Sequence, residues 1–126
     1  MSTHCTIKFV VSQRTDGMDL EPEVTVARLL QYADGYEDFV RPNLETALEE
    51  VRNMAIPEEI TADTIAATYT GIVDQGLRDW QSSYTAVMGP SAMKDQASRW
   101  QWLVEVDVEQ FTDSITWRII GGSDFT

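Results

Sequence analysis

The sequence of 126 residues contains one cysteine, one histidine and only two lysines. Its single cysteine, Cys5, excludes an internal disulfide. A zinc site needs about four nitrogen, sulfur or carboxylate ligands, and the adjacent His4 would point to the opposite face of a strand from Cys5. We therefore expect neither a metal site nor a cofactor.

Long apolar stretches are also lacking. No run approaches the roughly 18 residues that a membrane-spanning helix needs. The start of the chain has neither the basic residues nor the apolar block of a signal peptide. The sequence thus predicts a cytoplasmic protein that does not bind membranes.

The motifs of common enzyme classes are missing as well. No serine lies in a nucleophile elbow, and His4 is the only histidine that a catalytic triad could recruit. No glycine-rich loop is spaced to hold a phosphate. Carboxylate pairs for acid and base catalysis can be chosen in many ways in so acidic a chain, so they carry no specific signal. The sequence favours a protein that is not an enzyme.

Negative charge is what the sequence has in excess. Its 21 acidic residues outnumber 9 basic ones, which gives a formal charge of −12 at pH 7. The excess is uneven, because residues 16–63 hold 13 acidic side chains against three arginines, a net charge of −10. A field of this sign repels nucleic acids and anionic membranes and attracts basic surfaces. We expect a basic protein partner and no direct contact with nucleic acid.

Two segments near the start of the chain are predicted to be strands. Apolar and polar residues alternate over residues 5–11, which is typical of a half-buried strand. Residues 24–32 are rich enough in β-branched side chains for a second strand. Residues 27–30 would also tolerate a helix. Between the two strands, residues 12–23 are expected to form a long connection or a wide hairpin loop, and residues 33–36 to form a turn.

Apolar residues spaced by three and four predict two helices in the middle of the chain. The first follows this turn, with its apolar stripe over residues 40–54, Glu37 and Asp38 on its opposite face, and Pro42 tolerated near its beginning. The second has Thr61 as its N-cap and runs to Asp74. The β-branched residues 68–73 would also suit a strand, and this alternative stays open.

Helical spacing continues as far as Val87, so helix is expected to continue or resume there. Beyond it, alternation over residues 102–108 and 115–119 predicts an antiparallel hairpin, with Trp102 opposite Trp117. The order of strands, helices and strands predicts one α+β domain over the whole chain. We expect a mostly antiparallel sheet of about four strands, with two or three helices packed on one face.

Residues 2–9 (STHCTIKF) and 30–36 (LQYADGY), followed by a helix, resemble a group of small phage and bacterial proteins of unassigned activity. Members of that group open with a Ser-Thr-Arg-like strand and carry a Tyr-x-x-Asp-Gly-Tyr-Pro segment before a helix. The similarity covers about a quarter of the chain, and Glu37 stands where the group has proline. The resemblance implies a mobile-element context and no particular activity.

Two candidate sites follow from these patterns. The first is an acidic helical face that would dock on a basic, nucleic-acid-binding partner, as a nucleic-acid mimic does. Its side chains are Glu37, Asp38, Glu45, Glu49, Glu50, Glu58, Glu59 and Asp63. The second is a ligand pocket between helices and sheet near Tyr32, Asp34 and Tyr36.

The preferred hypothesis is a non-enzymatic interaction protein, an inhibitor from a phage or other mobile element that uses the acidic face. One alternative is a small enzyme or ligand-binding domain that uses the pocket. Another is a salt-adapted protein whose acidity reflects only its environment. A homodimer is compatible with each hypothesis.

Overall fold

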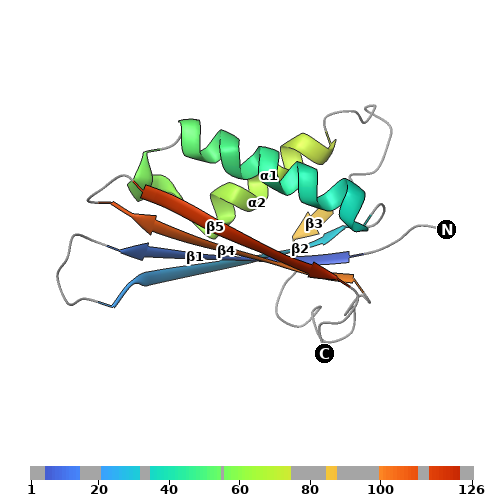
Figure 1. Ribbon diagram of the computed structural model, residues 1–126, viewed down its shortest axis with the longest axis horizontal. Coiled ribbons are helices and arrows are strands. Elements are labelled where there is room, and N and C mark those ends of the chain that lie inside the picture. The colour runs from blue at the N-terminus through green and yellow to red at the C-terminus, as the bar shows by residue number, and fades with distance from the viewer. Residues whose placement is uncertain are drawn as a thin grey trace.

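The computed structural model describes residues 5–14, 21–31, 35–54, 56–74, 85–87, 100–110 and 114–122. Two α-helices lie on one face of a five-stranded sheet (Figure 1). Its elements are β1 (Cys5–Arg14), β2 (Glu23–Gln31), α1 (Glu37–Met54), η1 (Pro57–Glu59), α2 (Ala62–Asp74), β3 (Thr85–Val87), β4 (Trp100–Glu109) and β5 (Ser114–Gly122).

The strands are arranged in the order β3-β2-β1-β4-β5. Three neighbouring pairs are antiparallel, and the central pair, β1 with β4, is parallel. The predicted α+β class with a mostly antiparallel sheet and helices on one face is therefore confirmed. The parallel pair was not predicted, because it joins Cys5 to Trp100 across most of the chain.

Strand β1 positions the core. Its side chains at Cys5, Ile7, Phe9 and Val11 have no solvent exposure, and they alternate with residues of the opposite face. The strand continues to Arg14, so the prediction that a connection begins at residue 12 was wrong. Gln13 keeps the alternation and is buried, and its amide nitrogen donates to the backbone oxygens of Pro57, at 2.8 Å, and Ile60.

Helix α1 begins at Glu37, directly after the expected turn. Its first backbone bonds run from the nitrogens of Phe39 and Val40 to the oxygen of Tyr36, at 3.2 and 3.0 Å. Pro42 consequently lies inside the helix, past the first turn where it was expected. Because proline has no N–H, the helix forgoes one internal hydrogen bond there.

Helix α2 has Thr61 at its N-cap, as predicted. The Thr61 hydroxyl accepts from the nitrogen of Thr64 at 3.3 Å, and the Thr64 hydroxyl accepts from the nitrogen of Thr61 at 2.8 Å. The strand alternative for residues 68–73 was wrong. Thr68 and Thr70 satisfy their hydroxyls by donating to backbone oxygens four residues earlier, which lets β-branched residues remain in a helix.

The prediction of helix as far as Val87 was wrong at its end, and residues 75–84 lie outside the described part. Val87 belongs to β3, where it pairs with Leu29 of β2. The backbone groups on the outer edge of β2 pair with those of β3. Helical spacing in the sequence cannot reveal such a partner.

The C-terminal hairpin of β4 and β5 is confirmed, with a different register. Trp102 lies opposite Gly121, and Trp117 lies opposite Val106. A Cβ atom at Gly121 would overlap the Trp102 ring, so the glycine makes room for the indole. The indole N–H of Trp102 donates to the backbone oxygen of Gly35 at 3.1 Å and so anchors the start of α1.

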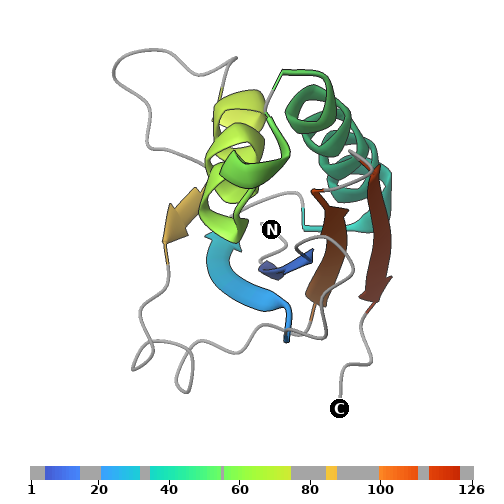
Figure 2. The same cartoon turned by 90° about the vertical axis from the view of Figure 1, so that its left-hand side faces the viewer.

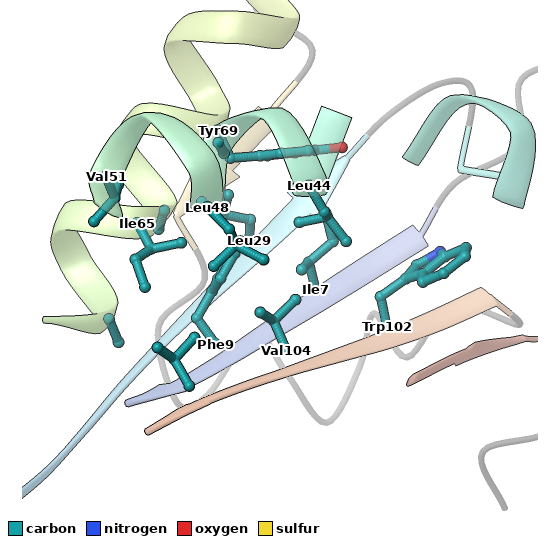
Figure 3. Close-up of a cluster of buried hydrophobic side chains, with 14 of the residues drawn as sticks. Ile7, Phe9, Leu29, Leu44, Leu48, Val51, Ile65, Tyr69, Trp102 and Val104 are labelled. Atoms are coloured by element: carbon teal, nitrogen blue, oxygen red, sulfur yellow. The ribbon is translucent and has the colours of Figure 1, made fainter. Parts of the chain in front are cut away.

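The core fills the space between the helices and one face of the sheet (Figure 3). In the view along the strands, α2 lies over β2 and α1 lies over β4 and β5 (Figure 2). Tyr69 is fully buried among apolar side chains, and its hydroxyl donates to the buried amide oxygen of Gln31. No helix in the described ranges has the length and apolar character to cross a lipid bilayer.

Candidate functional site

The eight carboxylates of the expected docking face belong to α1, η1 and α2, on the same side of the sheet (Figure 1). These three elements, which we call the helix layer, contain nine acidic residues and two arginines, a formal charge of −7. Strands β1, β2, β4 and β5 contain four acidic and four basic residues, a formal charge of zero. The described negative charge is therefore carried by the helix side of the protein.

Three of the eight carboxylates are engaged by neighbouring side chains. Glu37 accepts from the Arg41 guanidinium at 2.9 Å, and Glu49 pairs with Arg52. Glu45 accepts from the indole N–H of Trp117 on β5 at 3.2 Å. These three acids lie on the side of α1 that faces β5, where they take part in holding the helix on the sheet.

The two arginines of α1 strengthen the same contact between α1 and β5, which we call the seam. Arg41 lies 5.5 Å from the centre of the Trp102 ring and donates to the backbone oxygen of Ile119 at 3.4 Å. Arg52 lies 5.0 Å from the centre of the Trp117 ring. Cation–π contacts at partly exposed sites contribute about 0.5–1 kcal/mol each. The helix layer's only two cations are thus committed to internal contacts.

The other five carboxylates are exposed and have no ion pair or hydrogen bond with the residues that the structure describes. They are Asp38, Glu50, Glu58, Glu59 and Asp63. Asp38 stands in the first turn of α1. The remaining four lie near the end of α1, in η1 and in the first turn of α2, and we call them the acidic end. The acidic end occupies the connection between the two helices, at one end of the helix layer (Figure 1).

The expected pocket between helices and sheet gains no support from the described residues. Tyr32 and Asp34 lie outside the described ranges. Tyr36 is 43% exposed, and its backbone oxygen is occupied in capping α1. Two open hollows, of about 290 and 230 Å³, instead lie along β4 and β5 and share Asp107 and Thr116.

Cys5 is buried in the core, and this burial raises the pKa of its thiol to about 12. The neutral thiol is therefore the stable form at physiological pH, and a neutral thiol is a poor nucleophile and metal ligand. No three histidine, cysteine or carboxylate side chains in the described part of the chain gather as a metal site would require.

The face of the sheet that is turned away from the helices, which we call the open face, holds two residues that the sequence did not bring to attention. Lys8 of β1 and Arg28 of β2 are direct cross-strand partners. Alternation along β1 places Lys8 opposite to the core residues, but only the register reveals that Arg28 is its neighbour.

Comparisons of this chain with protein-family models, with curated proteins and with solved structures find no match. Function is therefore argued from the geometry and charge of the described residues alone.

Proposed function

We propose that this protein is a non-enzymatic interaction module whose acidic helix layer docks on the basic surface of a nucleic-acid-binding protein and inhibits it. The observation that carries this proposal is the set of five exposed, unpaired carboxylates on a layer of charge −7. Four of them form the acidic end.

Charge complementarity supports a nucleic-acid-like role for this surface. Glu45 and Glu49 are four residues apart on α1, a separation of about 5–6 Å on a helix surface, which is close to the spacing of phosphates. The acidic end adds carboxylates from three successive elements to the same layer, so the layer can meet basic side chains that otherwise bind phosphates. Complementary charge of this kind accelerates encounter and fixes orientation more than it adds affinity.

The engaged carboxylates divide the surface into two parts. Glu37, Glu45 and Glu49 are already bound within the protein, so a partner would have to compete with Arg41, Trp117 and Arg52 for them. The acidic end has no such competition. We therefore place the main contact at the acidic end and give the seam beside β5 a supporting part.

The first test compares two triple variants that remove equal charge. One variant, Glu50→Gln with Glu58→Gln and Glu59→Gln, neutralises exposed residues of the acidic end. The matched control, Glu21→Gln with Glu23→Gln and Asp107→Asn, neutralises exposed residues of β2, its approach and β4. The probe is an oligo-arginine peptide, titrated against each protein at low and high salt.

We expect the acidic-end variant to bind the probe about tenfold more weakly than the native protein, and the control to bind within about threefold. Binding by the native protein should weaken steeply with salt, because exposed charges are screened beyond about 10 Å at 0.1 M salt. Equal losses in both variants would show that only total charge matters, which would overturn the docking proposal.

The second test addresses inhibition. A basic protein that is retained from lysate by the native chain, and not by the acidic-end variant, is assayed for nucleic-acid binding with increasing amounts of each protein. The native chain and the control should compete with nucleic acid, and the acidic-end variant should not. If the acidic-end variant lowers the partner's binding to nucleic acid as strongly as the native chain does, the proposal is contradicted.

The salt-adaptation alternative is separated by stability. If the acidity were only environmental, the free energy of unfolding would rise markedly from low to molar potassium chloride. A docking protein from an ordinary environment gains little beyond the screening of its own repulsion. Chemical unfolding at both salt concentrations measures the difference.

A further inference from the structure

Two like charges meet on the open face of the sheet. Lys8 and Arg28 are Cα partners in the antiparallel pair of β1 and β2, so their side chains project from the same face next to each other. Lys8 is exposed and Arg28 is half-buried. Like charges directly opposite each other destabilise a sheet, and this protein has only 9 basic residues in total.

Neither cation has an ion pair within the described part of the chain. The ion pairs there use Arg41, Arg52 and Arg118, each bound to a glutamate. The Nε atom of Arg28 is buried and has no hydrogen-bond partner, whereas more than about 90% of buried polar groups are bonded. An unsatisfied guanidinium beside an ammonium group is a donor pair suited to an anion.

The immediate surroundings of the pair are apolar. On the same face, Val26 of β2 is 41% exposed and pairs with half-buried Val10 of β1. On the other side, Lys8 pairs with half-buried Leu103 of β4. These side chains cannot neutralise charge, but they can contact the hydrocarbon part of an organic molecule.

The nearest acids along β4 do not alter this environment. Glu105 stands two residues beyond Leu103 on the same face and is held by Arg118. Asp107 lies a further two residues along the strand. The open face thus presents an uncompensated positive spot beside an apolar strip, on a protein whose helix layer is strongly negative.

We propose that Lys8 and Arg28 form a binding site for an oxyanion group, a phosphate or carboxylate, carried on a small organic molecule. The Arg28 guanidinium donates through its terminal nitrogens, in the planar fork geometry that matches such groups. Lys8 adds a point charge from the neighbouring strand. The organic part lies against Val26 and Val10. The site is on the opposite side of the sheet from the helix layer, so it does not depend on the proposed docking function.

The test uses the full chain, labelled with nitrogen-15, in titrations followed by nuclear magnetic resonance. The probes are inorganic phosphate, hexyl phosphate and hexanoate. We expect saturable shifts of the backbone amides around Lys8 and Arg28, with hexyl phosphate binding more tightly than inorganic phosphate because its chain contacts Val26. Whichever of hexyl phosphate and hexanoate binds more tightly identifies the natural source of the oxyanion, and either result supports the site.

The variants Lys8→Met and Arg28→Met remove each charge and keep an apolar stem. Each should weaken hexyl phosphate binding about tenfold or more, since hydrogen bonds to charged groups are among the strongest polar contacts. Arg14→Met is the matched control, because it removes one exposed charge from the same strand and the same face, at the far end of β1 from Lys8. It should leave binding unchanged.

Three results would overturn the proposal. The first is no saturable shift with either alkyl probe. The second is binding that survives both Lys8→Met and Arg28→Met. The third is a loss with Arg14→Met as large as the loss with Arg28→Met, since this would indicate attraction by overall charge. Far-ultraviolet circular dichroism of each variant confirms that it is folded, so a loss of binding reports on the site.

Discussion

The two faces of the central sheet are made by the same strands and differ in nearly every property. On the helix side, Ile7 and Phe9 are fully buried, and the arginines that reach over from α1 are paired and stacked on tryptophan rings. On the open face, Val26 is 41% exposed, and Lys8 and Arg28 meet without an anion. Among the described residues, both arginines of α1 are paired with glutamates, whereas Lys8 and Arg28 are not, so the last two are the ones to test for function.

The comparison also separates two kinds of acidic residue. Glu45 and Glu49 are part of the seam between α1 and β5, although the sequence groups them with the other acids of the helix. Glu58 and Glu59 have no internal role of this kind. Net charge alone cannot distinguish a carboxylate that supports the fold from one that is free to bind a partner.

The largest expected difference between the faces is in core packing. Phe9→Ala should lower the free energy of unfolding by about 3–5 kcal/mol, because it opens a cavity among fully buried side chains. Val26→Ala on the open face should change it by only about 0.5 kcal/mol. Urea unfolding of both variants measures the contrast. Similar losses of stability in the two variants would mean that Val26 is buried to the same degree as Phe9.

Two glycines provide a second contrast. Gly121→Ala should destabilise the protein by about 1–3 kcal/mol, because the added methyl group overlaps the Trp102 ring. Gly71→Ala should stabilise it by about 0.5–1 kcal/mol, because Gly71 is in α2 and has open space around it. Thermal unfolding should show shifts of opposite sign, and a stable Gly121→Ala variant would contradict the Trp102 packing.

Two ion-paired arginines on opposite sides of the sheet should also differ in how much they contribute to the stability of the protein. Arg41→Met should cost about 1 kcal/mol, because it removes a stacking contact, a bond to Ile119 and the pair with Glu37. Arg118→Met should cost less than about 0.5 kcal/mol, because the Arg118 side chain is 70% exposed. The reverse order in chemical unfolding would show that the open face contributes more to stability than its exposure suggests.

The smallest effect at neutral pH concerns Cys5 on the covered face. Its pKa is raised by burial from 9.0 to about 12, so the folded state favours the neutral thiol. The corresponding stability is complete below pH 9 and is lost as the pH rises towards 12, because only the unfolded chain then releases the proton. The advantage of the native protein over Cys5→Ala should therefore shrink across this range.

A labelling experiment checks the same burial at pH 8. A thiol reagent should leave Cys5 unmodified in the folded protein and modify it fully in denaturant. Rapid labelling without denaturant would mean that the core opens readily around β1.

Local patterns predicted most of the elements. Alternation located the start of β1 and both strands of the C-terminal hairpin, and the N-cap at Thr61 located the start of α2. The predictions were wrong where the structure of a residue depends on a contact with a distant part of the chain. Gln13 extends β1 because backbone oxygens near η1 accept its amide, and Val87 joins a strand because β2 has a free edge. Neither partner is visible in the local sequence.

The candidate sites were predicted only in part. Charge counting found the acidic segment, and helical spacing put its side chains on two helices. It could not show that Trp117 engages Glu45, because this contact depends on how α1 lies over β5. The contact between Lys8 and Arg28 was not predicted for a similar reason, because the pairing register of two strands cannot be inferred from the sequence of either strand alone.

The parallel pairing of β1 with β4 has a consequence for how the protein is made. During synthesis β1 emerges well before its inner neighbour, Trp100–Glu109, which follows both helices. Until β4 is made, this edge of an apolar strand lacks its native partner, and such edges recruit other chains. Because the pair joins segments far apart in the sequence, we expect its formation to limit the rate of folding.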